Sequence, residues 1–212
     1  MVRGGVVLGF SAVVFTVGVL TGCGDTNDDA GGDPSATSTS ASGSGSGSAS
    51  ASGGEYVEAS AEGPAQNVPE PTKPALADEE SVEGAQAFLD YLSDARAYAQ
   101  QTGDTSLARE VTAKECQSCM NLYDTIDDLY EAGGWASRGY EKVTVISKEL
   151  PVDSYGFYAP EVSVDAEDIT AWGPGGEVVQ EVSGEESSDE SLAMHLAYLD
   201  GEWTYITGAP VG

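Results

Sequence analysis

Two cysteines spaced three residues apart, Cys116 and Cys119 in the stretch KECQSC, are the residues whose types and spacing could most readily do chemistry. Such a pair can be a redox site, half of a zinc site or a structural disulfide. Zinc needs two further ligands, and His195 is the only histidine in the chain. Thioredoxin-type redox sites lie between a strand and a helix, whereas helical patterns precede this pair. We therefore favour a structural disulfide, and we predict no metal and no cofactor.

The position of this pair relative to the helix that follows decides whether the disulfide can form. Thr112 and Glu115 have the spacing of a capping box, which would place both cysteines inside a helix. Side chains three apart on a regular helix have Cβ atoms about 5–6 Å apart, whereas a disulfide needs about 3.8 Å. We therefore expect the helix to begin near Cys116. A thiol at a helix start has a lowered pKa, so redox chemistry stays open as an alternative.

The N-terminus has the pattern of a secretion signal. Arg3 precedes an uncharged apolar run from Val6 to Leu20, which is short for a membrane-spanning helix. The run ends in Leu-Thr-Gly-Cys, which resembles the lipobox of bacterial lipoproteins. That resemblance implies a signal peptide over residues 1–22 and lipidation of Cys23. The alternative is a plain secretory signal, with Cys23 incidental.

Lipidation implies a location and accounts for the odd cysteine. Two acyl chains on Cys23 would hold the protein to the cell membrane on its extracytoplasmic face. Disulfides persist in that oxidising environment, so Cys116 and Cys119 are left to pair with each other. The formal net charge of −28 repels polyanions, so we expect no nucleic-acid partner.

Residues 23–78 have the composition of a disordered tether. Residues 34–54 are almost wholly Ser, Gly, Ala and Thr, and the segment after them is rich in Pro, Glu and Ala. Such sequences bury too little apolar surface to offset the entropy lost on ordering. We therefore predict a single folded domain over residues 79–212, held away from the membrane.

Helical periodicity opens this domain. Apolar residues recur at helical spacing from Val82 to Ala99, with Ser81 as a candidate N-cap and Gly103 as a helix stop. A short helix is expected over residues 106–111, with Asp104 as its cap. A third helix carries an apolar stripe and ends at a Gly-Gly pair: Cys119, Met120, Tyr123, Ile126 and Tyr130, then Gly133 and Gly134.

After Trp135 the pattern changes to strands. Four segments have the β-branched or alternating character of strands: residues 142–150, 158–169, 176–184 and 191–199. The turn Asp200-Gly201 leads into a fifth, over 202–207, and the acidic run 185–190 fills a loop. Helices followed by four or five mostly antiparallel strands predict an α+β fold.

This order of elements is similar to the NTF2-like (cystatin-like) fold, in which N-terminal helices pack on a curved, cone-shaped antiparallel sheet. Residues 74–207 also resemble a family of uncharacterised actinobacterial lipoproteins with a domain of unknown function. The residues that carry this resemblance are Gly84, Ala85, Phe88, Thr102, Gly103, Asp104, Cys116, Cys119, Gly133 and Gly134. The resemblance brings no catalytic residue.

The remaining candidate residues point to two classes of function. His195 lies mid-strand, where we expect it to be packed or at a sheet edge, and no G-x-S-x-G motif accompanies it. Aromatic residues concentrate in the strand half, where they either fill the core or line a pocket in the mouth of the cone: Trp135, Tyr140, Tyr155, Phe157, Tyr158, Trp172, Tyr198, Trp203 and Tyr205.

We expect a lipid-anchored cell-envelope protein, not an enzyme, whose domain binds a small molecule, a glycan or a protein. The alternative is an extracytoplasmic enzyme. It would be an isomerase or hydrolase with its site in a cone pocket, or a thiol–disulfide catalyst using Cys116 and Cys119. Cone-fold isomerases use an Asp base and a Tyr donor, but the sequence identifies no such pair and no ligand-binding residues.

Overall fold

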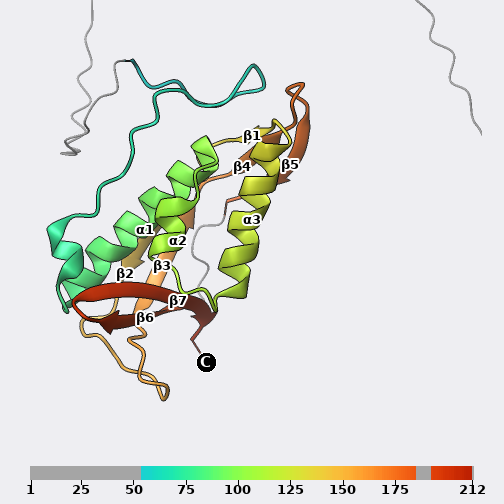
Figure 1. Ribbon diagram of the computed structural model, residues 1–212. Helices are drawn as coiled ribbons and strands as arrows, with labels where there is room; N and C mark the ends of the chain where they lie inside the picture. Colours follow the sequence, from blue (N-terminus) through green and yellow to red (C-terminus); the bar gives the residue numbers. More distant parts are fainter. Residues whose placement is uncertain (1–53, 185–191, 212) are drawn as a thin grey trace, which may run out of the picture. The chain divides into compact units, whose positions relative to one another are not determined.

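The computed structural model describes residues 54–184 and 192–211 (Figure 1). The predictions for Cys23 and for the acidic run 185–190 lie outside these residues. Helices come first and strands follow, which confirms the α+β class: η1 (Ala75–Asp78), α1 (Val82–Thr102), α2 (Ser106–Glu110), α3 (Gln117–Glu131), β1 (Trp135–Ala136), β2 (Glu141–Val145), β3 (Glu161–Ala166), β4 (Ile169–Trp172), β5 (Val178–Val182), β6 (Leu192–Leu199) and β7 (Glu202–Pro210).

Helix α1 is the central element of the described residues and begins and ends where the sequence predicts. The Ser81 hydroxyl accepts a hydrogen bond from the Gly84 N–H at 3.0 Å, which caps the first turn. Gly103 follows the helix with φ 77°, and its N–H donates to the Ala99 carbonyl. The helix packs against η1, α2, α3, β1 and β2, with Phe88, Leu89 and Leu92 in its buried face.

The connection from α2 to α3 is held beside the last strand. The Tyr205 N–H donates to the Val111 carbonyl at 2.9 Å, and the Ala113 N–H donates to the Tyr205 carbonyl at 2.8 Å. These two bonds make a short parallel bridge between Thr112 and β7. The segment that delivers Cys116 is therefore fixed by contacts to a strand about 90 residues further along the chain.

The two cysteines form a disulfide at the start of α3. Cys116 is the N-cap residue, with φ −71° and ψ 83°, so it lies outside the regular helix, which confirms the predicted helix start near Cys116. The Cα atoms of Cys116 and Cys119 are 5.3 Å apart, within the usual range for a disulfide. Both residues are buried in the core, at 6% and 7% exposure. The bond therefore joins the α2–α3 connection to the first turn of α3.

Replacing both cysteines by serine should lower stability without removing the fold. The closed loop is short, so chain entropy predicts a loss of about 2 kcal/mol, or roughly 5 °C in Tm. Thermal unfolding followed by circular dichroism, with and without a reductant, measures this loss. A variant that fails to fold would show that the bond is essential for folding. An unchanged Tm would show that the bond does not stabilise the domain.

The strands form two antiparallel sheets rather than the single curved sheet that we expected. One has the order β2-β3-β6-β7 and the other β1-β4-β5. The difference arises at Trp135–Ala136 and Ile169–Trp172, two short strands that lack a clear alternating pattern. They pair through the register Trp135 with Trp172 and Ala136 with Ala171.

Close packing around Gly134 explains how the smaller sheet forms. The indole rings of Trp135 and Trp172 stack with centroids 6.5 Å apart. A Cβ atom on Gly134 would lie 2.5 Å from the Trp172 carbonyl oxygen, so this position accepts only glycine without a backbone shift. The predicted Gly-Gly stop of α3 therefore also brings β1 against β4.

The hairpin of β6 and β7 completes the larger sheet. Asp200 and Gly201 both have positive φ, at 55° and 90°, which confirms the predicted turn. The pairing shifts between His195 and Leu196, where a bulge interrupts the register. The main core lies between the helices and this sheet, and its fully or almost fully buried large side chains include Phe88, Leu89, Leu92, Tyr123, Val162 and Leu196.

Candidate ligand groove

Residues 54–72, which we call the N-terminal strap, are ordered by contacts with the domain. The strap contains a bridge between Val57 and Gln66. The Tyr56 hydroxyl donates to Gln101 Oε1 at 2.6 Å, and the Trp135 indole N–H donates to the Ser60 carbonyl at 2.7 Å. This corrects our expectation of a disordered tether through residue 78. A few apolar and aromatic side chains, together with long-range hydrogen bonds, offset the entropy cost that the composition implies.

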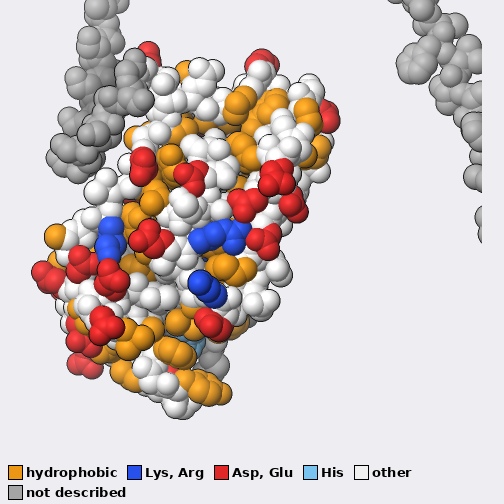
Figure 2. All heavy atoms as spheres, viewed as in Figure 1, with side chains coloured by type: hydrophobic (Ala, Val, Ile, Leu, Met, Phe, Trp, Pro, Cys, Tyr) orange, Lys and Arg blue, Asp and Glu red, His pale blue; other side chains and the backbone are white. Residues whose placement is uncertain are grey.

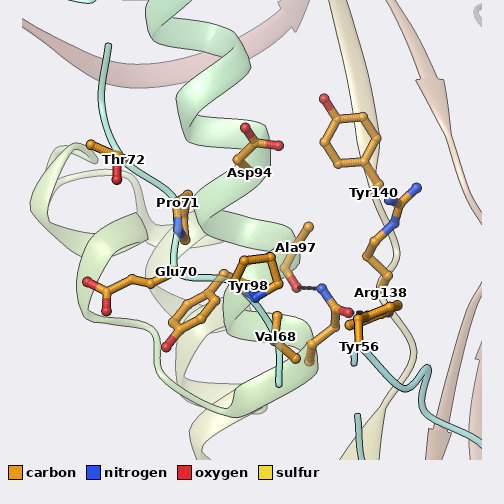
Figure 3. A pocket seen from close by; sticks show the side chains of 12 residues that line it. Tyr56, Val68, Glu70, Pro71, Thr72, Asp94, Ala97, Tyr98, Arg138 and Tyr140 are labelled. Carbon is orange, nitrogen blue, oxygen red and sulfur yellow. Dashed lines mark hydrogen bonds between the residues drawn. The ribbon is translucent and has the colours of Figure 1, made fainter. Parts of the chain in front are cut away.

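An open groove of about 640 Å³ lies between the strap, α1 and the residues that precede β2 (Figure 3). Its walls combine tyrosine rings, prolines and a few charged groups, a mixture typical of ligand sites. The lining residues are Tyr56, Val68, Pro69, Glu70, Pro71, Thr72, Asp94, Ala97, Tyr98, Gln101, Arg138 and Tyr140. The groove depends on the strap for one of its walls, so it exists only when the strap is ordered.

Figure 3 shows how the charged groups are placed. Asp94, on α1, lies on the side of the groove nearer to Tyr140 and Arg138, and Glu70 lies beside Tyr98 at the other end. Within the described part of the chain, neither the Asp94 nor the Glu70 carboxylate forms a hydrogen bond or an ion pair. Both are therefore available to a ligand.

The one arginine of the groove is already paired. Arg138 Nε donates to Glu167 Oε2 at 3.1 Å, and its Nη2 donates to the other oxygen of the same carboxylate. The guanidinium also lies over the Tyr140 ring, 5.0 Å from its centroid. Glu167 in turn accepts the Tyr140 N–H, so it fixes both groove residues. This pair neutralises Arg138 and leaves the groove with an excess of negative charge.

The pKa shifts in the groove have a common cause. Desolvation raises the pKa of Asp94 above its usual value, and neighbouring Asp90 raises it further, while Arg138 acts in the opposite direction. Desolvation also raises the pKa values of Tyr98 and Tyr140, with Glu70 adding to the first and Asp94 to the second. The tyrosines therefore remain neutral, and each lies in the field of a carboxylate.

His195 is half-buried in β6 and pairs with an aspartate. Its Nδ1 lies 2.8 Å from Asp153 Oδ2, and the other oxygen of Asp153 accepts the N–H groups of Tyr155 and Phe157. The pair closes the loop between β2 and β3 onto β6. A catalytic triad would also need a serine hydroxyl bonded to His195, and none of the described serines forms such a bond. The Asp153–His195 pair therefore lacks the nucleophile of a triad.

The Asp153–His195 contact predicts a pH dependence. Partial burial raises the pKa of Asp153, but hydrogen bonds from the Phe157 and Tyr155 N–H groups, together with His195, outweigh it and lower the pKa below the usual 3.8. The unfolded chain therefore takes up this proton first as the pH falls. The stabilisation is complete above about pH 4 and is lost below it.

A carbon-13 NMR titration of the Asp153 carboxyl measures this directly. We expect a midpoint below 3.8 in the native chain and a midpoint closer to that value in His195→Gln. A native midpoint at or above 3.8 would contradict the assigned contacts.

Most of the residues singled out in the sequence lie away from the groove. Cys116 and Cys119 are buried in the core. Of the nine aromatic residues in the strand half, Tyr140 lines the groove, whereas Tyr158 and Tyr198 each contact Trp203. The sequence signal for the groove was Tyr56 and Val68, two large apolar or aromatic side chains in a segment whose other residues are mostly small or polar.

The described residues contain no helix long and apolar enough to cross a bilayer. They also contain no group of three or more His, Cys, Asp or Glu side chains arranged to hold a metal ion.

Comparison with known proteins identifies one family. Neither curated proteins nor solved structures give a match. A family model described as "Family of unknown function (DUF6318)" matches residues 54–209. Its first matched residue is also the first residue of the strap, so the match includes the strap as well as the helices and sheets. The match spans well over half of the chain, which therefore belongs to this family of unknown function, DUF6318.

Proposed function

We propose that this protein is a lipid-anchored component of the cell envelope whose domain binds a ligand in the groove beneath the N-terminal strap. The single observation that carries the binding function is the groove itself. It is concave, it is lined by three tyrosines, and it holds two carboxylates without partners among the described residues. Concave sites with aromatic walls and a few convergent polar groups are the usual form of small-ligand sites.

The anchor rests on the N-terminal sequence. The apolar run and the Leu-Thr-Gly-Cys motif support cleavage before Cys23 and acylation of its thiol. Residues between Cys23 and the strap would then link the membrane to the wall of the groove. Metabolic labelling with a fatty acid, followed by cell fractionation, tests this part. We expect label on the membrane-bound wild type and none on Cys23→Ala, whose uncleaved apolar run can itself retain the chain in the membrane. An unlabelled wild type, or label on the variant, would contradict the anchor.

Ligand capture tests the groove. Native mass spectrometry of the full chain, purified in a non-ionic detergent from its own envelope, should show a bound small molecule. Tyr98→Ala removes a ring from the groove and should weaken binding about tenfold or more. Tyr155→Ala is the matched control, because Tyr155 is 84% exposed and lies outside the groove. Equal capture by the two variants, or capture by neither variant nor the wild type, would contradict the proposal.

A second candidate function is catalysis in the same groove. Its support is the raised pKa of Asp94 and the placement of Asp94 with Tyr140. A base and a hydroxyl donor of these types serve in cone-fold isomerases. We also propose an NTF2-like cone as the fold, because the helices precede an antiparallel sheet of order β2-β3-β6-β7. Asp94→Asn distinguishes the two functions, since an enzyme would lose turnover while the captured molecule stays bound.

A further inference from the structure

We infer that the groove recognises a ligand bearing a protonated amine, which the Asp94 or the Glu70 carboxylate holds beside the tyrosine rings. This inference rests on the proposed function, and it adds the chemical class of the ligand. The amine could belong to an amino sugar or to a polyamine, which share the ammonium group.

The charge of the groove is the first argument. Asp94 and Glu70 have no partner among the residues that the structure describes, and Arg138 is neutralised by Glu167. The groove therefore carries about two uncompensated negative charges, and Asp90 adds to the field at Asp94. An anionic ligand would meet repulsion at both ends. An ammonium group would gain charge-assisted hydrogen bonds, which are roughly twice as strong as neutral ones.

The aromatic walls are the second argument. Tyr56, Tyr98 and Tyr140 present ring surfaces to the groove, and the faces of such rings attract cations. Arg138, over the Tyr140 ring, already shows this attraction within the protein. Tyr98 lies beside Glu70 (Figure 3), so a ring and a carboxylate are available together at that end of the groove. Carboxylates combined with aromatic rings favour an organic cation over a bare metal ion, because a metal ion gains little from the rings.

The surrounding surface favours the same ligand. Figure 2 shows Asp and Glu side chains spread over the visible face of the described domain, with few Lys and Arg among them. The formal net charge of the chain is −28. Such a field raises the local concentration of cations and speeds their encounter, and salt screens this effect. Because the field acts on every cation, the test needs variants that separate the groove from the general surface.

Two sugars that differ in one group test whether the ligand needs an ammonium group. Glucosamine and N-acetylglucosamine have the same ring, but only the first carries an ammonium group. We would titrate each into the full chain in non-ionic detergent by calorimetry, with spermidine as the polyamine probe. We expect glucosamine or spermidine to bind, with affinity falling as salt is added, and N-acetylglucosamine to bind at least about tenfold more weakly. The tighter of the two amines identifies the source of the ammonium group.

Charge-neutral variants place the binding in the groove. A ligand with one amine reaches one of these two carboxylates, so either Asp94→Asn or Glu70→Gln should weaken glucosamine binding about tenfold. Asp128→Asn and Glu131→Gln are the matched controls, because both residues are exposed and lie on α3 outside the groove. Equal losses in variants and controls would overturn the inference by showing general attraction to an acidic protein.

The remaining outcomes separate this inference from the proposed function. Binding of N-acetylglucosamine as tight as that of glucosamine, lost in Tyr98→Ala, would overturn the amine and leave the groove as a ligand site. Failure of both amines to bind would also overturn the inference. Native mass spectrometry of the captured ligand would then test the proposed function separately.

Discussion

Gly84→Ala should lower the free energy of unfolding by about 3 kcal/mol, although alanine is the better helix former by about 1 kcal/mol. Gly84 lies in the first turn of α1, where the chain leaving η1 crosses the helix. A Cβ atom there would lie 1.9 Å from the Glu79 carbonyl oxygen and 3.1 Å from that of Leu76. Both neighbours are backbone atoms, so relief requires the chain itself to move.

That movement would break other contacts, which is why a large effect is expected. The Glu79 carbonyl accepts hydrogen bonds from the Ser81 N–H at 2.9 Å and from the Trp203 indole N–H at 3.0 Å. Displacing it therefore loosens both the cap of α1 and the contact with β7. Urea unfolding of the variant measures the loss. Gly63→Ala is the matched control, because a Cβ atom on Gly63 meets nothing within 4 Å. Gly84→Ala with wild-type stability would contradict the packing.

Replacing Tyr123 should also cost several kcal/mol, because its ring and its hydroxyl both serve the core. The residue is completely buried on α3. Its hydroxyl lies 3.1 Å from Thr112 Oγ1 and accepts a hydrogen bond from Arg96 Nε at 3.3 Å. The Thr112 hydroxyl donates to the Ala108 carbonyl at 2.7 Å, so the Tyr123 hydroxyl is the donor between the two. Helices α1 and α3 and the α2–α3 connection thus meet in one polar chain within the core.

Two substitutions separate the contributions. Tyr123→Ala should lower the free energy of unfolding by about 3–5 kcal/mol through the lost ring and the cavity. Tyr123→Phe keeps the ring and leaves the Thr112 and Arg96 groups without this partner, so we expect a loss of about 1–3 kcal/mol. Pairing Tyr123→Phe with Arg96→Met in a double-mutant cycle measures their coupling. Equal stability of Tyr123→Phe and the wild type would show that the hydroxyl network does not stabilise the domain.

The helices and the disulfide could be predicted because their signals are local. Ser81 and Gly103 delimit α1 through caps that need only neighbouring residues. The start of α3 near Cys116 followed from a distance argument, since a bond between Cys116 and Cys119 excludes regular helix at the first of them. The turn at Asp200-Gly201 is a local signal of the same kind.

The strap and the smaller sheet could not be predicted because distant contacts order them. Tyr56 bonds to Gln101, 45 residues away, and Ser60 accepts from Trp135, 75 residues away. A segment rich in Pro, Ala and Glu has no periodicity that records such partners. The sequence therefore identified α1, the one helix among the described residues that lines the groove, but neither the strap wall nor the placement of Asp94 beside it.

Hydrogen–deuterium exchange of the full chain, with and without the molecule captured from its own envelope, tests the central claim most directly. If the groove is the ligand site, exchange should slow in the strap, residues 54–72, and around Asp94 and Tyr98 on α1. Residues 178–182 of β5, which are exposed and lie outside the groove, should be unchanged. Slowed exchange confined to elements away from the strap and α1 would contradict the assignment of the groove as the ligand site.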